Sequence, residues 1–187
     1  SSAAATAAVI ASVLEYHGHK PDKEEIYKLA TIAHYFAQGK VGSAFDVAAS
    51  TYGGVFVYSR FDPDWLTRKM EAGEKIAAIV SEKWPGFYVE ELDIPQDFRL
   101  IIGWTKEEAS TSTMVKQMNE FKKANQQQYE KAIKTVADCA HNAIDAWHEK
   151  DWGRLIIELQ NNEQALAQLG RVSGVRIETP QLETMAE

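Results

Sequence analysis

Two kinds of hydrophobic pattern alternate in the first half of the chain, and this alternation constrains the fold most strongly. Apolar residues three to four positions apart predict helices at residues 2–16 and 22–38. Runs of β-branched and aromatic residues predict strands at residues 55–61 and 87–94. Because helices and strands are mixed without a regular βαβ repeat, we expect an α+β fold.

The second half of the chain has a different pattern. After Pro95, an apolar run at residues 98–103 predicts a buried strand that ends at a glycine. The remainder is expected to be helical, at residues 113–126, 128–150, 152–169 and 180–186. This change predicts two lobes, one over residues 1–95 and the other over residues 96–187.

Composition excludes several classes of protein. The 187 residues are 45% hydrophobic and 25% charged, and their apolar runs are too short to cross a bilayer. The net charge of −7 and the scattered Lys and Arg residues argue against a nucleic-acid partner. One cysteine, Cys139, cannot form an internal disulfide, and no signal peptide is visible, so we expect a cytoplasmic protein. The oligomeric state stays open, with a homodimer as one possibility.

The first predicted helix begins with the tract "SSAAATAA", which is almost bare of large side chains. A helix N-terminus presents unpaired N–H groups and the positive end of the helix dipole, so it can bind phosphate. Small residues let a polyphosphate approach the backbone, and a serine hydroxyl adds a donor to phosphate or a ligand to Mg²⁺. The alternative is an ordinary serine cap on an alanine-rich helix, and the tract alone favours this alternative.

A second polar segment, "GKVGSAFDVAAS", combines glycines, a serine and an acidic residue. Gly39, Gly42 and Ser43 precede Asp46, which stands just inside a helix of small residues. An acidic side chain at a helix start is normally a cap or a partner of the helix dipole. The same group of residues is also suited to form a polar rim around a reacting phosphate. The sequence leaves both interpretations open.

A third segment, "IIGWTKEEASTSTMVKQ", places four hydroxyl residues, Ser110 to Thr113, at the head of a predicted helix. A capping box explains one or two of them. Four hydroxyls exceed what one cap needs, and Lys106 adds a positive charge nearby. A second anion-binding helix start is therefore the alternative to a simple cap.

Taken together, the three segments resemble the GHMP kinase superfamily. "SSAAATAA" is similar to the end of its glycine-rich ATP motif, and "GSAFDVAASTYGG" is similar to the acidic-loop segment of mevalonate kinases. "GWTKEEASTSTMV" resembles the second-lobe signature of bacterial-type phosphomevalonate kinases. The resemblance implies a two-lobed α+β fold. Its N-terminal lobe would be like domain 2 of ribosomal protein S5, and its helix-rich C-terminal lobe would be ferredoxin-like.

The resemblance also implies a reaction and a site. ATP, with Mg²⁺, would transfer its γ-phosphoryl group to 5-phosphomevalonate in the mevalonate pathway. Asp46 would hold the catalytic acidic position, and Ser2 would be a ligand of Mg²⁺. The residues implied in binding the nucleotide phosphates are Ser1, Ser2 and Ala3. Those implied in binding the acceptor phosphate are Gly42, Ser43, Ser110, Thr111 and Ser112.

The sequence also departs from the family pattern. "TIAHYFAQGK" offers His34, Tyr35 and Gln38 but no carboxylate where mevalonate kinases place a metal-binding glutamate. Mg²⁺ is therefore expected to rely on Ser2, phosphates and water. The family's N-terminal lysine segment, its leading Gly-Leu-Gly and its late glycine-rich motif are absent from the sequence, so we expect this chain to be inactive alone. Mevalonate kinase or another small-molecule GHMP kinase is the alternative activity, and a non-catalytic helix-rich binding domain is the alternative of another class.

Overall fold

The computed structural model describes residues 2–39, 42–101 and 111–177, without the side chains of Thr111 and Ser112. The chain divides into two compact units, Ser1–Leu100 and Ile101–Glu187. Each unit is described by itself. That these units are the nucleotide-binding and C-terminal lobes of a kinase stays a prediction.

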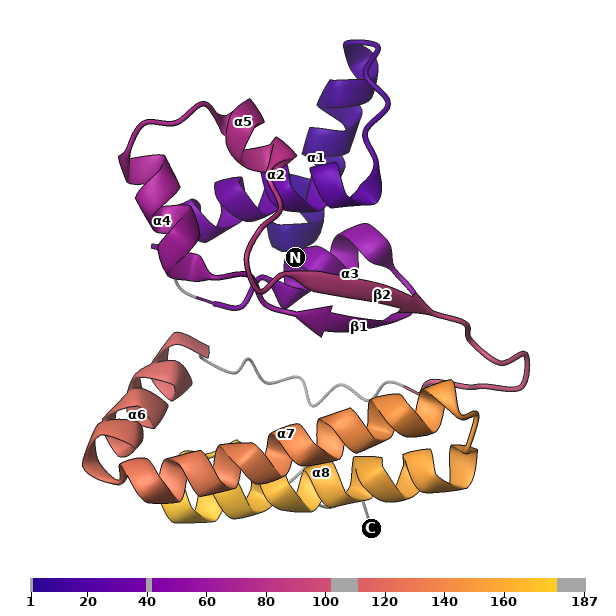
Figure 1. The fold of residues 1–187 in the computed structure, drawn as a ribbon, viewed down its shortest axis with the longest axis vertical. Helices are drawn as coiled ribbons and strands as arrows, with labels where there is room; N and C mark the ends of the chain where they lie inside the picture. The colour runs from indigo at the N-terminus through magenta and orange to yellow at the C-terminus, as the bar shows by residue number, and fades with distance from the viewer. Residues whose placement is uncertain (1, 40–41, 102–110, 178–187) are drawn as a thin grey trace. The chain divides into compact units, whose positions relative to one another are not determined.

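The first unit contains helices that pack on one another and a pair of short strands (Figure 1). Its elements are α1 (Ser2–Tyr16), α2 (Lys23–Ala37), α3 (Phe45–Tyr52), β1 (Val55–Ser59), α4 (Pro63–Glu71), α5 (Ile76–Ser81) and β2 (Tyr88–Leu92). Helices α1, α2 and α3 contact each other, α5 contacts α2 and α4, and α3 contacts β1. The two strands pair antiparallel, with Val57 opposite Glu90. These bounds confirm the helices and strands predicted for this part of the chain.

Local signals in the sequence explain where two of these helices begin. The side chain of Asp22 accepts the Glu25 N–H at 2.8 Å and so caps α2. Asp62 caps α4 by accepting two backbone N–H groups, and Pro63 occupies the first helical position. Both caps satisfy donors that a helix start leaves unpaired, which stabilises each helix by about 1 kcal/mol.

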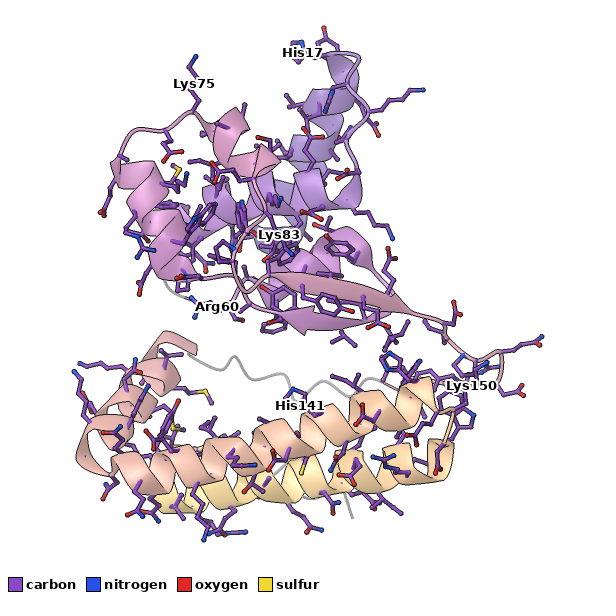
Figure 2. The ribbon with its side chains drawn as sticks, in the orientation of Figure 1. His17, Arg60, Lys75, Lys83, His141 and Lys150 are labelled. Atoms are coloured by element: carbon purple, nitrogen blue, oxygen red, sulfur yellow. The ribbon has the colours of Figure 1, made fainter. Side chains whose placement is uncertain are left out.

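The second unit is helical in its described residues. It contains α6 (Thr111–Ala124), α7 (Gln126–His148) and α8 (Trp152–Ser173). Helices α7 and α8 lie side by side as an antiparallel hairpin, and Lys150, with a φ of 56°, lies in the short turn between them (Figure 2). The rings of Trp147 and Trp152 meet edge to face at this turn, with centroids 5.6 Å apart. Cys139 is buried in α7.

The strand predicted at residues 98–103 is wrong for the part of it that the structure describes. Residues 98–101 have no strand hydrogen bonding, and Leu100 and Ile101 are 72% and 91% exposed. Among the described residues, β1 and β2 pair only with each other, so residues 98–101 are paired with neither strand. An apolar run cannot form a strand without such a partner. Gly103 and the helix predicted at residues 180–186 lie outside the described residues.

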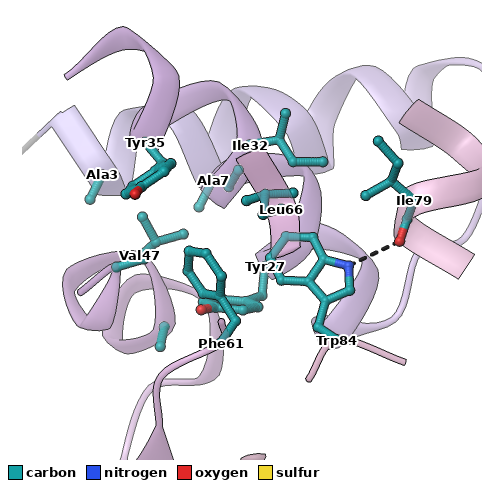
Figure 3. Packing of buried hydrophobic residues seen from close by; sticks show 13 residues of the cluster. Ala3, Ala7, Tyr27, Ile32, Tyr35, Val47, Phe61, Leu66, Ile79 and Trp84 are labelled. Carbon is teal, nitrogen blue, oxygen red and sulfur yellow. Dashed lines mark hydrogen bonds between the residues drawn. The ribbon is translucent and has the colours of Figure 1, made fainter. Parts of the chain in front are cut away.

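A cluster of buried aromatic and aliphatic side chains holds the first unit together (Figure 3). Its largest fully buried members are Trp84, Tyr27, Phe61, Leu66, Ile79 and Val47. The indole N–H of Trp84 donates to the Ile79 carbonyl at 2.9 Å, so its one polar atom is satisfied in the core. Ala3 and Ala7 of α1 belong to the same cluster and are 0% and 5% exposed. Close packing of α1 therefore accounts for part of the alanine tract.

Lys28 ties α2 to the end of α5. Its side chain is almost fully buried, and its Nζ donates to the carbonyls of Val80 at 3.0 Å and Glu82 at 2.7 Å. The same Nζ forms an ion pair with Glu24 at 2.7 Å. A buried ammonium group is stable only when it is paired in this way, and the carbonyls at a helix C-terminus favour a positive charge.

We expect Lys28→Met to lower the free energy of unfolding by about 2–4 kcal/mol, because it leaves two carbonyls without their donor. Urea unfolding of the intact protein, followed by tryptophan fluorescence, measures this loss. Lys83→Met is the matched control because the Lys83 side chain is exposed (Figure 2). Equal unfolding midpoints for the two variants would contradict the role assigned to Lys28.

Candidate active site

Three segments of the first unit meet at one histidine nitrogen. Nε2 of His34, on α2, lies 3.0 Å from the Ser2 hydroxyl oxygen at the start of α1. It also lies 3.1 Å from the Gln38 amide nitrogen and 4.0 Å from Asp46 Oδ2 on α3. Figure 1 shows the start of α1 beside α3. The structure therefore brings Ser2 and Asp46, two of the predicted site residues, to the same place.

His34 lies at the boundary between the core and the solvent. Its side chain is 6% exposed, whereas Ser2 and Gln38 are exposed and the Asp46 side chain is 46% exposed. His34 and Gln38 are four residues apart on a helix, so they share one face of α2. The buried ring thus presents a single nitrogen to a polar, solvent-accessible cluster.

The first turn of α1 combines an exposed polar residue with a buried apolar one. Ser2 is exposed, while the Ala3 side chain is fully buried in the core. Ala3 is therefore able to bind a ligand only through its backbone N–H. The Thr6 hydroxyl donates to the Ser2 carbonyl at 2.9 Å, within the first turn. Ser1 lies outside the described residues.

The loop before α3 has an unusual backbone that the core holds in place. Gly42 has a φ of +104°, and Ala44, the residue at the start of α3, has a φ of +58° with no side-chain cap. A left-handed conformation costs a residue with a Cβ about 1–2 kcal/mol. The carbonyl of Ser43, between them, accepts a hydrogen bond of 2.6 Å from the Tyr58 hydroxyl on β1. This contact fixes the loop that carries Gly42 and Ser43, the two residues that are predicted to bind the acceptor phosphate.

The Tyr58 hydroxyl is itself part of a chain of donors. It lies 2.9 Å from the hydroxyl of Tyr27, which is fully buried on α2. Because the Tyr58 proton goes to Ser43, Tyr27 must donate to the Tyr58 oxygen. Burial raises the pKa of both tyrosines above the ordinary value of 10, so both stay protonated donors at neutral pH.

Asp46 lies in the first turn of α3, one residue beyond Phe45. Its Oδ1 accepts the N–H of Val47 at 3.0 Å, and Oδ2 is the atom that faces His34. The residue that caps α3 is Ala44, so the interpretation of Asp46 as the helix cap is wrong. An interaction of its charge with the helix dipole remains, and so does a role at the site.

In the second unit, α6 begins at Thr111, so three of the four hydroxyl residues lie in its first turn. Ser112 follows Thr111 in that turn, and Ser110 lies outside the described residues. The binding of an acceptor phosphate at this helix start stays a prediction.

The described ranges contain neither a cluster of metal ligands nor a membrane-spanning helix. No group of three or more His, Cys, Asp or Glu side chains in those ranges is arranged to hold a metal ion. Over the same residues, none of the helices combines the length and the hydropathy that a membrane span requires.

Sequence reasoning missed two residues of this site. The sequence pattern shows only that His34 lies in the segment where mevalonate kinases place a glutamate. In the structure, Ser2 and Gln38 both contact this residue. The signal was a histidine on the apolar face of a helix, followed one turn later by Gln38. The sequence predicts Tyr58 only as part of a strand. No local pattern in the sequence links it to Ser43.

The chain is similar in sequence to proteins of known family. Residues 1–54, which carry Ser2, His34 and Asp46, match the family described as GHMP kinases N terminal domain. The phosphomevalonate kinase of Streptomyces sp. strain CL190 is 31% identical over 190 residues, which cover 100% of this chain and 50% of that protein. The phosphomevalonate kinase erg8 of Aspergillus fumigatus is 32% identical over 181 residues, which cover 88% of this chain and 35% of that protein.

Solved structures show the same fold. A crystal structure of the Lin0012 protein from Listeria innocua has a TM-score of 0.86 and 31% identity, and the match covers 97% of this chain and 50% of that one. Streptococcus pneumoniae phosphomevalonate kinase in complex with phosphomevalonate and AMPPNP has a TM-score of 0.69 and 23% identity. That match covers 84% of this chain and 45% of the other.

The first 54 residues are similar to the GHMP kinase N-terminal domain, and the fold is similar to that of solved structures that include a phosphomevalonate kinase. In sequence, the chain is similar to phosphomevalonate kinases from bacteria and fungi. It spans about half the length of the Streptomyces relative. The expected α+β, GHMP-type fold is thereby confirmed.

We expect Tyr58→Phe to lower the free energy of unfolding by about 1 kcal/mol at neutral pH, because Ser43 loses its donor and Tyr27 loses its acceptor. Urea unfolding of the intact protein measures this difference. Tyr88→Phe is the control, since the Tyr88 hydroxyl bonds only an exposed Glu90 carboxylate and its loss should barely move the midpoint.

The difference in stability between the unaltered protein and Tyr58→Phe should depend on pH. Burial raises the pKa of Tyr58 in the folded protein above the ordinary value of about 10 that it has in the unfolded chain. The stability that protonated Tyr58 contributes is therefore complete below about pH 10 and is lost as the pH rises above about 10. The variant lacks this titrating group. The stability difference between the unaltered protein and Tyr58→Phe should therefore shrink above about pH 10, and a difference that grows there would contradict the assignment.

Proposed function

We propose that the intact protein transfers the γ-phosphoryl group of ATP to 5-phosphomevalonate and forms the diphosphate. The observation that carries the proposal is the meeting of the Ser2 hydroxyl and the Asp46 carboxylate at one nitrogen of His34. Both lie in the segment that matches the GHMP kinase N-terminal domain. Relatives named phosphomevalonate kinase at 31% and 32% identity support this choice of acceptor.

In this proposal, the start of α1 binds the nucleotide phosphates. Its exposed end offers the Ser2 hydroxyl and backbone N–H groups to an anion, and the positive end of the helix dipole favours the charge. Ser1, Ser2 and Ala3 would contribute these groups, Ala3 through its N–H alone. The AMPPNP-bound structure of the Streptococcus pneumoniae enzyme supports a nucleotide in a protein of this fold.

The oxygen atoms at this place also fit Mg²⁺ as ligands. The Ser2 hydroxyl and the Asp46 carboxylate are hard oxygen groups, and Mg²⁺ usually takes one or two such protein ligands and fills the rest with phosphate oxygens and water. When bound, the cation would neutralise charge on the transferring phosphate. Ser2 would be the protein ligand, with Asp46 close enough to hold a water of the hydration shell.

The acceptor phosphate would lie against the loop before α3. Gly42 and the Ser43 backbone are held there by the Tyr58 contact. Ser110, Thr111 and Ser112, at the start of α6, would supply a second set of donors. In this arrangement, residues 1–95 and residues 96–187 belong to the nucleotide-binding and C-terminal lobes of the kinase.

The chemistry of the acceptor limits what Asp46 has to do. The second proton of a phosphate monoester has a pKa near 6, so the attacking oxygen is mostly ionised at neutral pH. A general base then gains little, and transfer depends on positioning and on charge neutralisation. We assign Asp46 to orienting a cationic group or a metal-bound water.

A coupled assay with the intact protein tests the proposed reaction. With ATP and Mg²⁺ present, 5-phosphomevalonate should be converted to its diphosphate, and kcat/KM should exceed that for mevalonate by at least about 10²-fold, since a site built for a phosphate leaves its donors unpaired with an alcohol. Preference for mevalonate would assign the protein to mevalonate kinase. Failure of ATP with Mg²⁺ to raise the unfolding temperature would favour a non-catalytic binding domain.

Asp46→Asn tests the assigned role. We expect kcat to fall by less than about 10²-fold, which is the lower end of what proton transfer contributes to catalysis. Asp64→Asn is the matched control, because Asp64 also lies in the first turn of a helix but on α4. A loss approaching 10⁴-fold in Asp46→Asn alone would show that Asp46 acts as a general base.

Two expectations about the cellular form belong to the proposal as well. We place the protein in the cytoplasm, and fractionation of the source cells tests this. Light scattering on the intact protein tests the homodimer that the sequence leaves open.

A further inference from the structure

The contacts of His34 determine where its ring proton lies. The Gln38 amide nitrogen is 3.1 Å from Nε2, and an amide nitrogen donates hydrogen bonds but does not accept them. This donor makes Nε2 the accepting nitrogen of the ring and leaves the ring proton on Nδ1.

The same reasoning fixes the direction of the Ser2 hydroxyl. Its oxygen lies 3.0 Å from Nε2, within hydrogen-bond distance. An oxygen lone pair aimed at an unprotonated nitrogen at this distance would be repelled, so the hydroxyl donates to Nε2 and shares the single lone pair of that nitrogen with the Gln38 amide. The two lone pairs of the hydroxyl oxygen then face away from His34, toward the exposed side of the cluster.

We propose that His34 is a positioning residue that orients the Ser2 hydroxyl so that its lone pairs, not its proton, meet the bound nucleotide. Ser2 then suits a cation held by the phosphates and not a phosphate oxygen, which would need a donor. The inference rests on the proposed function in that it deepens the nucleotide site, and it assigns a role to a residue that does not itself touch substrate.

Burial makes His34 fit for this task. A ring that is 94% enclosed has few rotamers available, and Gln38 holds it from one helical turn away. Asp46 Oδ2, at 4.0 Å from Nε2, is beyond hydrogen-bond distance and does not compete for the ring. The carboxylate is the one charged group among the cluster's four side chains, and it leaves the Ser2 contact intact.

Nitrogen-15 NMR of the histidine rings tests the proton position directly. In the intact protein, the His34 signals, assigned by their loss in His34→Gln, should show an unprotonated Nε2 and a protonated Nδ1. This readout needs no activity and no ligand. A protonated Nε2 would overturn the proposal, because the Ser2 hydroxyl would then accept and would present its proton outward.

Binding measurements test the consequence. In calorimetric titrations of the intact protein, His34→Leu should weaken binding of ATP with Mg²⁺ by about tenfold, the worth of one well-placed hydrogen bond. Binding of ATP in the presence of a chelator should change much less. His34→Gln should restore most of the affinity, since its carbonyl oxygen can accept the hydroxyl proton in place of Nε2. His141→Leu, on the exposed face of α7 (Figure 2), is the control and should leave binding unchanged.

A double variant separates orientation from general loosening of the fold. If His34 acts through Ser2, then Ser2→Ala combined with His34→Leu should bind ATP with Mg²⁺ no more weakly than Ser2→Ala alone. Losses that add would overturn the proposal, and so would equal losses with and without Mg²⁺. If the unaltered protein binds ATP with Mg²⁺ but does not phosphorylate 5-phosphomevalonate, the proposed function fails while these comparisons still decide the role of His34. Absence of that binding would contradict both.

Discussion

The structure of the first unit depends on the close packing of α1 against α2 and α3. Ala3 and Ala7 are buried in the same cluster as Tyr27 and Val47, and larger side chains at these two positions would hold the helices apart. This contact places the Ser2 hydroxyl 3.0 Å from His34 Nε2 on α2, and the packing of α3 places Asp46 Oδ2 4.0 Å from the same nitrogen. The alanine tract therefore has a structural cause and a consequence for the site, and the two interpretations of it are compatible.

Much of this could be predicted from the sequence, because local patterns set it. Helical spacing predicts α1 and α2 to within a residue or two, and Asp22 and Asp62 mark two helix starts by capping. The three polar segments, through their resemblance to GHMP kinases, predict the fold that the comparisons confirm and a similarity to the GHMP kinase N-terminal domain that residues 1–54 show.

What the sequence could not predict depends on contacts between distant segments. Nothing near residue 34 shows that the ring is buried or that it meets Ser2, since this requires the crossing of α1 and α2. The contact of Tyr58 with Ser43 requires the placement of β1 beside the loop. The strand expected at residues 98–103 is wrong because a strand also depends on a distant segment for its hydrogen bonds. The apolar run near Leu100 is not paired with any strand among the described residues.

The line of hydroxyls from Tyr27 through Tyr58 to the Ser43 carbonyl couples the core to the loop before α3. Ala44, in the same loop, is itself buried in the aromatic cluster, so loosening of that cluster reaches the loop both through the hydrogen bonds and through direct packing. On warming, the loop should therefore lose its geometry together with the first loosening of the core, below the temperature at which the helices melt. In such a molecule, distortion of this loop on heating reports on the integrity of the aromatic cluster.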